Sequence, residues 1–111
     1  MQALVQGKGE WVYTKTRVVA EGGHPKAQLV MGILCQLGIG TAQNGREAIK
    51  WYRLAGEQND VLAWKNLGTL YLLGLAGVTI DKTEAYRCLS RAKALESDQN
   101  ADRLADERTI H

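Results

Sequence analysis

Two cysteines and two histidines are the residues of this 111-residue chain best suited to nucleophilic chemistry or metal binding. A cysteine nucleophile needs a histidine within hydrogen-bonding reach, but His24 lies in a Gly-rich turn and His111 is the last residue. Neither Cys35 nor Cys88 belongs to a cluster with the short spacing of metal ligands. The sequence therefore predicts no catalytic cysteine, no metal site and no bound cofactor.

Four carboxylates stand where an acid–base catalyst could be sought, namely Glu47, Asp60, Asp81 and Glu84. Each lies where a helix is predicted to begin, and there a carboxylate meets free backbone N–H groups and the positive end of the helix dipole. Asp81 with Glu84 has the three-residue spacing of a capping box, as does Asn44 with Glu47. We assign these residues to helix capping and expect the chain not to be an enzyme.

Charge balance and hydropathy restrict the partners of the chain. Its 14 basic and 12 acidic side chains give a formal charge of +2, and they are scattered rather than clustered, so we expect no nucleic-acid binding. No apolar run approaches the roughly 20 residues that span a bilayer, and the N-terminus lacks the pattern of a secretory signal. We expect no membrane span and a cytoplasmic protein, or a periplasmic or secreted one whose leader has been removed.

The elements that must position these residues are helices. Apolar residues recur at spacings of three and four along most of the chain, which predicts amphipathic helices. Pro25 suits the first turn of one helix, and Gly38 and Gly40 permit the left-handed backbone that ends it. No alternating period-two run indicates a strand.

The chain also contains an internal repeat. A shift of 36 residues, and of 37 after one inserted residue near Gly77, superimposes small, apolar and capping residues. A period of this length is typical of stacked helix–turn–helix units. The superimposed pairs are Ala27 and Ala63, Gly32 and Gly68, Leu34 and Leu70, Leu37 and Leu73, Gly38 and Gly74, Glu47 and Glu84, Ala48 and Ala85, and Ala55 and Ala92.

The first copy contains Ala27-Gln28, Gly32, Leu34, Gly38-Ile39-Gly40 and the run EAIKWYRLA from Glu47 to Ala55. These segments resemble a Sel1-like repeat, a relative of the tetratricopeptide repeat. The resemblance implies an all-α fold, a short right-handed α-solenoid of antiparallel helix pairs with about six helices. Within a single domain of residues 1–111 we expect a half-repeat helix at 10–22, repeats at 24–57 and 60–95, and a capping helix at 97–109.

The cysteines occupy positions that are aromatic in the sister copy. Cys35 stands where Tyr71 stands in the second copy, and Cys88 stands where Trp51 stands in the first. Because those aromatic positions belong to the core of the repeat, we expect both thiols to be buried. A disulfide needs Cα atoms within about 7 Å, and the two cysteines belong to different layers, so we expect free thiols.

The resemblance further implies a protein-binding module, an adaptor or scaffold, that holds a protein or peptide along its concave face. The first helix of each repeat lines that face with a mixed apolar and basic strip, which suits an amphipathic segment with some acidic character. Alternatively, Leu29, Ile33 and Leu72 pack against the flanking helices. The predicted residues of the strip are Lys26, Leu29, Ile33, Gln36, Leu62, Lys65, Thr69 and Leu72.

One aromatic residue and two other functions stay open at this level. Trp64 occupies a position that is Gln28 in the first copy, and it is either an interface anchor, since Trp is enriched at hot spots, or a packing substitution. Because isolated repeats bury little surface, the chain could instead be a self-associating structural unit, a homodimer. An inhibitor or immunity-type protein that blocks one target would have the same sequence features.

Overall fold

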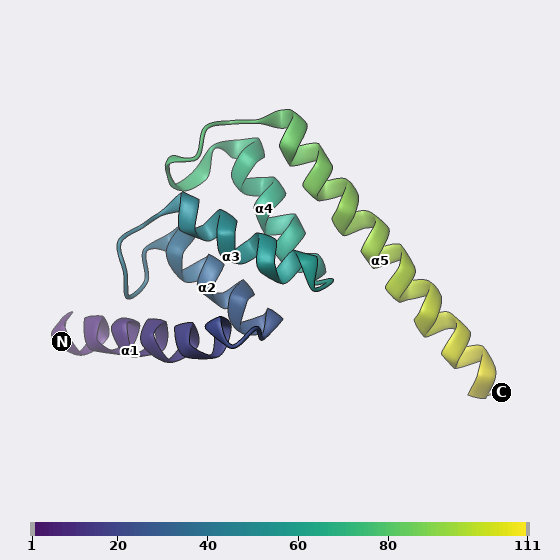
Figure 1. Ribbon diagram of the computed structural model, residues 1–111, viewed down its shortest axis with the longest axis horizontal. Helices are drawn as coiled ribbons and strands as arrows, with labels where there is room; N and C mark the ends of the chain where they lie inside the picture. Colours follow the sequence, from purple (N-terminus) through teal and green to yellow (C-terminus); the bar gives the residue numbers. More distant parts are fainter. Residues whose placement is uncertain (1, 111) are drawn as a thin grey trace.

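The computed structural model describes the backbone of residues 2–110 and the side chains of residues 7–105 (Figure 1). Its helices are α1 (Gln2–Glu21), α2 (Pro25–Leu37), α3 (Gly45–Glu57), α4 (Val61–Leu73), the short 3-10 helix η1 (Leu75–Gly77) and α5 (Lys82–Ile110). The described residues contain no strand, and each α-helix packs on the one that follows it. The result is an elongated stack of 55 × 34 × 24 Å, which confirms the predicted all-helical solenoid.

Repeat 1 consists of α2 and α3, and repeat 2 consists of α4 and the first part of α5 (Figure 1). The predicted caps begin three of these helices. The Oδ1 atoms of Asn44, Asp60 and Asp81 accept hydrogen bonds from the backbone N–H groups three residues on, over 3.1, 2.9 and 3.0 Å. These side chains therefore satisfy donors that have no partner inside the helix.

Glycine ends the first helix of both repeats in the same way. Gly38 after α2 and Gly74 after α4 have φ values of 71° and 66°, and their N–H groups donate to Leu34 O and Leu70 O. A residue with a Cβ is strained in this left-handed conformation. The identical ends, 36 residues apart, fix the direction in which each chain segment turns toward its second helix.

Two helix boundaries differ from the prediction, although the five α-helices and one 3-10 helix of the described residues roughly match the predicted count of about six. A separate capping helix at 97–109 was wrong, because α5 runs without a break from Lys82 to Ile110; no Gly or Pro interrupts it near Ser97. The first helix begins at Gln2 rather than near residue 10. It continues through Gly9, whose backbone lies so close to Gly40 that a Cβ on Gly40 would collide with it.

Small residues let the two helices of each repeat approach closely. A Cβ on Gly32 of α2 would overlap the ring of Tyr52 in α3, and a Cβ on Gly68 of α4 would lie 2.8 Å from side-chain atoms of Leu89 in α5. A shift of 37 residues places Leu89 on Tyr52. Each repeat is therefore held together by an equivalent glycine contact, with the Tyr52 ring in repeat 1 and the Leu89 side chain in repeat 2.

The two cysteines are buried and unbridged, as predicted. Burial raises the pKa of the Cys35 thiol, and the nearby Glu47 carboxylate raises it further. Burial likewise raises the pKa of Cys88, with Glu84 adding to the effect. A raised pKa lowers the fraction of thiolate, the reactive form, so these positions serve packing rather than nucleophilic chemistry.

Tyr52 is fully buried, and its hydroxyl donates to Gln36 Oε1 over 2.6 Å. Burial raises the pKa of this hydroxyl to about 12. The folded state therefore retains the Tyr52 proton at a pH where the unfolded chain has lost it. The contribution of this hydroxyl to folding stability is fully present below pH 10 and is lost as the pH rises to 12.

We predict that alkaline pH destabilises the protein through Tyr52. Between pH 10 and pH 12 this residue should contribute a loss of roughly 2–3 kcal/mol in the free energy of unfolding, measured by urea denaturation. Tyr52→Phe should flatten the decline, whereas Tyr86→Phe, which alters an exposed tyrosine, should leave it unchanged. An equally steep decline in Tyr52→Phe would contradict the assignment.

Candidate partner-binding site

The predicted strip lies on α2 and α4, the first helices of the two repeats. A shift of 36 residues pairs its members, so each position occurs twice along the stack. The strip is uneven in exposure: four side chains are exposed, three are half-buried and one is buried. The exposed ones are Lys26, Leu62, Lys65 and Thr69, the half-buried ones are Ile33, Gln36 and Leu72, and the buried one is Leu29.

Leu29 is a core residue, and its assignment to the partner-binding strip was wrong. It is only 6% exposed and belongs to the same buried cluster as Ala20 of α1 and Leu34 of α2. Packing of α1 on α2 provides the apolar surroundings in which a leucine is more stable than in water. The equivalent position in repeat 2 is Lys65, which stays exposed.

Gln36 has a structural partner as well. Its side-chain oxygen accepts the Tyr52 hydroxyl, and its backbone oxygen accepts from Gln43 Nε2 over 3.0 Å. Thr69 also uses its hydroxyl internally, donating to Lys65 O over 3.0 Å. The middle of the strip thus combines half-buried apolar side chains with polar groups that are already engaged.

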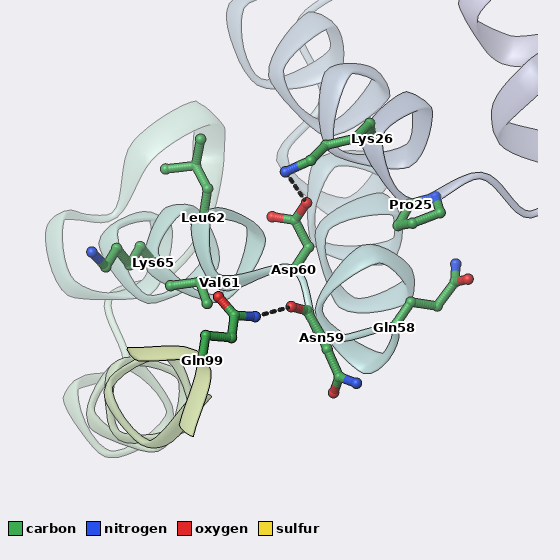
Figure 2. A pocket seen from close by; sticks show the side chains of 9 residues that line it. All are labelled: Pro25, Lys26, Gln58, Asn59, Asp60, Val61, Leu62, Lys65 and Gln99. Carbon is green, nitrogen blue, oxygen red and sulfur yellow. Dashed lines mark hydrogen bonds and ion pairs between the residues drawn. The ribbon is translucent and has the colours of Figure 1, made fainter. Parts of the chain in front are cut away.

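Three strip residues, Lys26, Leu62 and Lys65, meet between the two repeats, around a cavity of about 460 Å³ (Figure 2). The cavity lies between the start of α2, the turn that joins α3 to α4, the first turns of α4, and one residue of α5. Figure 2 shows that these segments, although distant in sequence, face a common space. The lining residues are Pro25, Lys26, Gln58, Asn59, Asp60, Val61, Leu62, Lys65 and Gln99.

Two ion pairs set the charge of this cavity. Lys26 Nζ lies 3.0 Å from Asp60 Oδ2, and the Lys26 side chain is 82% exposed while that of Asp60 is 2% exposed. Lys65 Nζ lies 3.2 Å from Glu96 Oε1, with both side chains about half exposed. Because an ammonium group has three donors, each lysine retains N–H groups for an incoming acceptor.

The α3–α4 turn carries the polar half of the cavity. One carboxylate oxygen of Asp60 caps α4 by accepting from Ala63 N–H, and the other accepts from Lys26 Nζ. Both oxygens of this buried carboxylate are therefore paired. Asn59 adopts a φ of 71°, and its backbone oxygen accepts from Gln99 Nε2 over 3.3 Å (Figure 2). The cavity therefore offers ammonium and amide groups beside an apolar wall that includes Leu62, which is 48% exposed.

Sequence reasoning missed the turn residues and Gln99. The turn was assigned to helix capping, which is correct for Asp60, but its second role as the partner of Lys26 depends on how the two repeats stack. Gln99 was missed because a new helix was expected near residue 97. In the described side chains, no three of His, Cys, Asp and Glu are grouped to hold a metal ion, and none of the described helices is long and apolar enough to span a membrane.

Comparison with known proteins agrees with the helix pairs and their glycine contacts. The sequence model of the Sel1 repeat family matches residues 25–60 and 65–97, which coincide with the two pairs of helices. The chain belongs to the Sel1 repeat family.

Two relatives contain segments that match this Sel1 chain. A sel1-like repeat-containing protein of Acanthamoeba polyphaga mimivirus is 36% identical over 60% of this chain and 12% of its own length. A chitin synthase regulator of Malassezia restricta is 36% identical over 66% of this chain and 5% of its own. The chain thus spans a small part of these relatives.

Two solved structures have the same fold. A Sel1 repeat protein from Oxalobacter formigenes superimposes with a TM-score of 0.68 at 35% identity, over 78% of this chain and 35% of that one. A protective antigen of uropathogenic Escherichia coli superimposes with a TM-score of 0.68 at 30% identity, over 74% of this chain and 17% of that one. The Sel1 architecture of repeats 1 and 2 is therefore shared with longer solenoids.

Within this Sel1 architecture, the contact between α3 and α4 decides the role of Trp64. Trp64 is 3% exposed, so it is a packing residue, and its role as an exposed interface anchor was wrong. A Cβ on Gly56 would lie 2.5–2.9 Å from its indole, and Arg91 lies over the ring, 4.8 Å from the centroid. Glycine at position 56 thus makes room for the indole.

The contact between α1 and α2 has different residues at the equivalent positions. A shift of 36 places Ala20 on Gly56 and Gln28 on Trp64, and there Gln28 Nε2 donates to Ala20 O over 3.2 Å. The hydrogen bond of Gln28 to Ala20 between α1 and α2 is thus replaced by apolar packing of Trp64 on Gly56 between α3 and α4. The two changes occur together because alanine beside the indole would crowd it.

We predict that Gly56 and Trp64 are energetically coupled. Gly56→Ala should destabilise the protein by about 1–3 kcal/mol because the added methyl overpacks the indole. In the Trp64→Gln background the same change should stabilise, since alanine is the better helix former. Urea denaturation of the four proteins measures this coupling.

Gly7→Ala provides the matched control, because a Cβ there meets nothing within 4 Å. It should be neutral or slightly stabilising in both backgrounds. Stabilisation by Gly56→Ala in the presence of Trp64 would contradict the proposed compensation.

Proposed function

We propose that this chain is a non-catalytic protein-binding module, an adaptor or scaffold, which holds a segment of another protein on the face formed by α2 and α4. The observation that supports this most directly is the convergence of Lys26, Leu62 and Lys65 on one cavity between the repeats. Solvent-exposed apolar and basic groups held by rigid helices are suited to binding rather than to a chemical step.

The chemistry of the cavity favours a segment with one acidic side chain close to an apolar one. Lys26 on α2 and Lys65 on α4 each have ammonium N–H groups left over to donate to a partner. Leu62 on α4 adds exposed apolar surface to the same cavity. Asp60 and Glu96 balance the lysines in the unbound protein. A partner carboxylate would share the ammonium groups with them, so the electrostatic gain is moderate and the apolar contact contributes a large part of the affinity.

The name of one relative supports a function that is exerted by acting on another protein. One relative is named as a regulator of chitin synthase, which describes action on another protein. This chain covers 5% of that relative, so the proposal takes from it only the general idea of acting through another protein. The kind of segment bound is inferred from the chemistry of the cavity instead.

We predict that a photo-crosslinking residue in place of Leu62 captures a defined set of proteins in living cells. The same substitution at Tyr86, a still more exposed residue of α5 outside the cavity, is the control and should not capture that set. Mass spectrometry of the adducts identifies the segment attached.

A second variant tests the role of charge. Lys65→Ser combined with the crosslinker at Leu62 should reduce the yield of the specific adducts at least several-fold, while surface substitutions of this kind change stability by no more than about 0.5 kcal/mol. Identical adduct patterns from Leu62 and Tyr86, or yields that do not respond to Lys65→Ser, would contradict the proposed site.

A further inference from the structure

The first helix has two faces, and only one of them is packed. Gly9, Tyr13, Thr16 and Ala20 are the half-buried or buried residues that repeat every three to four positions along α1 and face the rest of the stack. On another side of the same helix, Lys8, Val12, Lys15 and Val19 follow each other at i, i+4, i+7 and i+11, which is one continuous face. We refer to these four residues as the α1 outer face.

The α1 outer face exposes apolar surface. Val12 is 37% and Val19 is 47% exposed, and the neighbouring Trp11 and Val18 are more exposed still. α1 packs on α2, and Figure 1 shows no other described helix on the far side of α1. Valine is uncommon at fully solvated helix positions because it is neither a strong helix former nor polar.

The internal repeat shows what covers this face elsewhere in the molecule. A shift of 36 residues places Val12 on Ala48 and Val19 on Ala55, both of which are completely buried. A further shift of 37 residues leads to Ala85 and Ala92 of α5, which are equally buried. Since α4 is the helix that packs on α5, these alanines mark the face on which the second helix of a repeat meets its own first helix.

A second contact confirms the register of α1. Gly9 lies against the turn residue Gly40, and Gly45 lies against Ala76 in the same way, 36 residues further on. α1 therefore occupies the place of a second helix of a repeat. The face that α2 covers on α3, and that α4 covers on α5, has no helix on α1 among the described residues.

The charge of the α1 outer face indicates what kind of helix fits it. Lys8 and Lys15 are its only ionisable residues, and neither makes a hydrogen bond or ion pair with a described side chain. The acid Glu21, by contrast, is paired with Arg17 over 2.8 Å on a different side of the helix. The face is thus apolar with a basic flank.

Self-pairing does not satisfy these charges. Lys15 stands midway between Val12 and Val19, so a two-fold pairing of two α1 helices about the middle of the face would bring the two copies of Lys15 together. Like charges at the centre of an isologous contact oppose association. A helix with carboxylates at the matching positions turns the same two lysines into favourable contacts.

We propose that the α1 outer face is a second docking site, which binds an amphipathic α-helix of another protein in the place that α2 occupies on α3. That helix has an apolar stripe for Val12 and Val19 and acidic residues for Lys8 and Lys15. In repeat 1, the ring of Tyr52 requires a glycine, Gly32, on the helix that covers it. The equivalent residue of α1 is the smaller Thr16, so the docked helix can have a large side chain at the position of Gly32.

The exposed side of α5, at the other end of the solenoid, is more strongly charged, although it also exposes Tyr86 and Leu104. The exposed side of α5 includes Lys82, Arg87, Ser90 and Lys93, which are suited to contact with water. The α1 outer face is separate from the cavity at Lys26 and Lys65.

The test uses two synthetic 18-residue helical peptides with the same leucine stripe, one flanked by glutamates and the other by lysines. Each is titrated into the full ¹⁵N-labelled chain and followed by NMR. The glutamate peptide should bind saturably and shift the amide signals of Val12, Lys15 and Val19, whereas the lysine peptide should bind at least tenfold more weakly. Lys15→Glu should remove or reverse this preference.

Matched variants separate loss of binding from loss of fold. Val19→Asp should weaken binding of the glutamate peptide at least tenfold with unchanged helicity by circular dichroism, while Leu54→Asp, at a similarly exposed leucine of α3, should have no effect. Equal binding of both peptides, shifts confined to α2 and α4, or no saturable binding would overturn the proposal. A dimer in sedimentation that Val19→Asp dissociates would overturn it as well, by assigning the face to a second copy.

Discussion

The close approach of two helices at a glycine is the constraint on which the rest of this structure depends. Gly32 admits the ring of Tyr52, and Gly68 admits Leu89, so the two helices of each repeat lie nearer to each other than larger residues would allow. Among the described residues, each α-helix makes its main contacts with its neighbours in the stack, as in other solenoids, so stability is approximately the sum of these local contacts. The turn that follows each first helix, with its left-handed glycine, then sets where the second helix begins.

The cavity at Lys26, Leu62 and Lys65 is a product of this stacking rather than of any one repeat. Asp60 caps α4 and at the same time holds Lys26 of α2, which ties the start of one repeat to the start of the next. Gln99 reaches the same turn from α5. A residue whose first duty is local capping therefore also positions the exposed lysine that we assign to partner binding.

Much of the fold follows from the sequence because it is encoded locally. The caps at Asn44, Asp60 and Asp81 and the glycine ends are short-range patterns, and the repeat makes each of them visible twice. The burial of the cysteines follows from their sister positions. What could not be predicted depends on the neighbours in space: Leu29 is buried because α1 packs on α2, and Trp64 is buried because Gly56 provides the room. The continuation of α5 past Ser97 was missed because a residue suited to capping also fits an exposed position inside a long helix.

The most direct test of the central constraint is the effect of Gly32→Ala on the free energy of unfolding, measured by urea denaturation. In an open helix, this substitution stabilises by up to about 1 kcal/mol. Because the added Cβ would overlap the ring of Tyr52, we expect a net loss of about 1–3 kcal/mol. An unchanged or increased stability would show that the two helices of repeat 1 do not depend on the glycine contact, and would contradict the account of how the stack is held together.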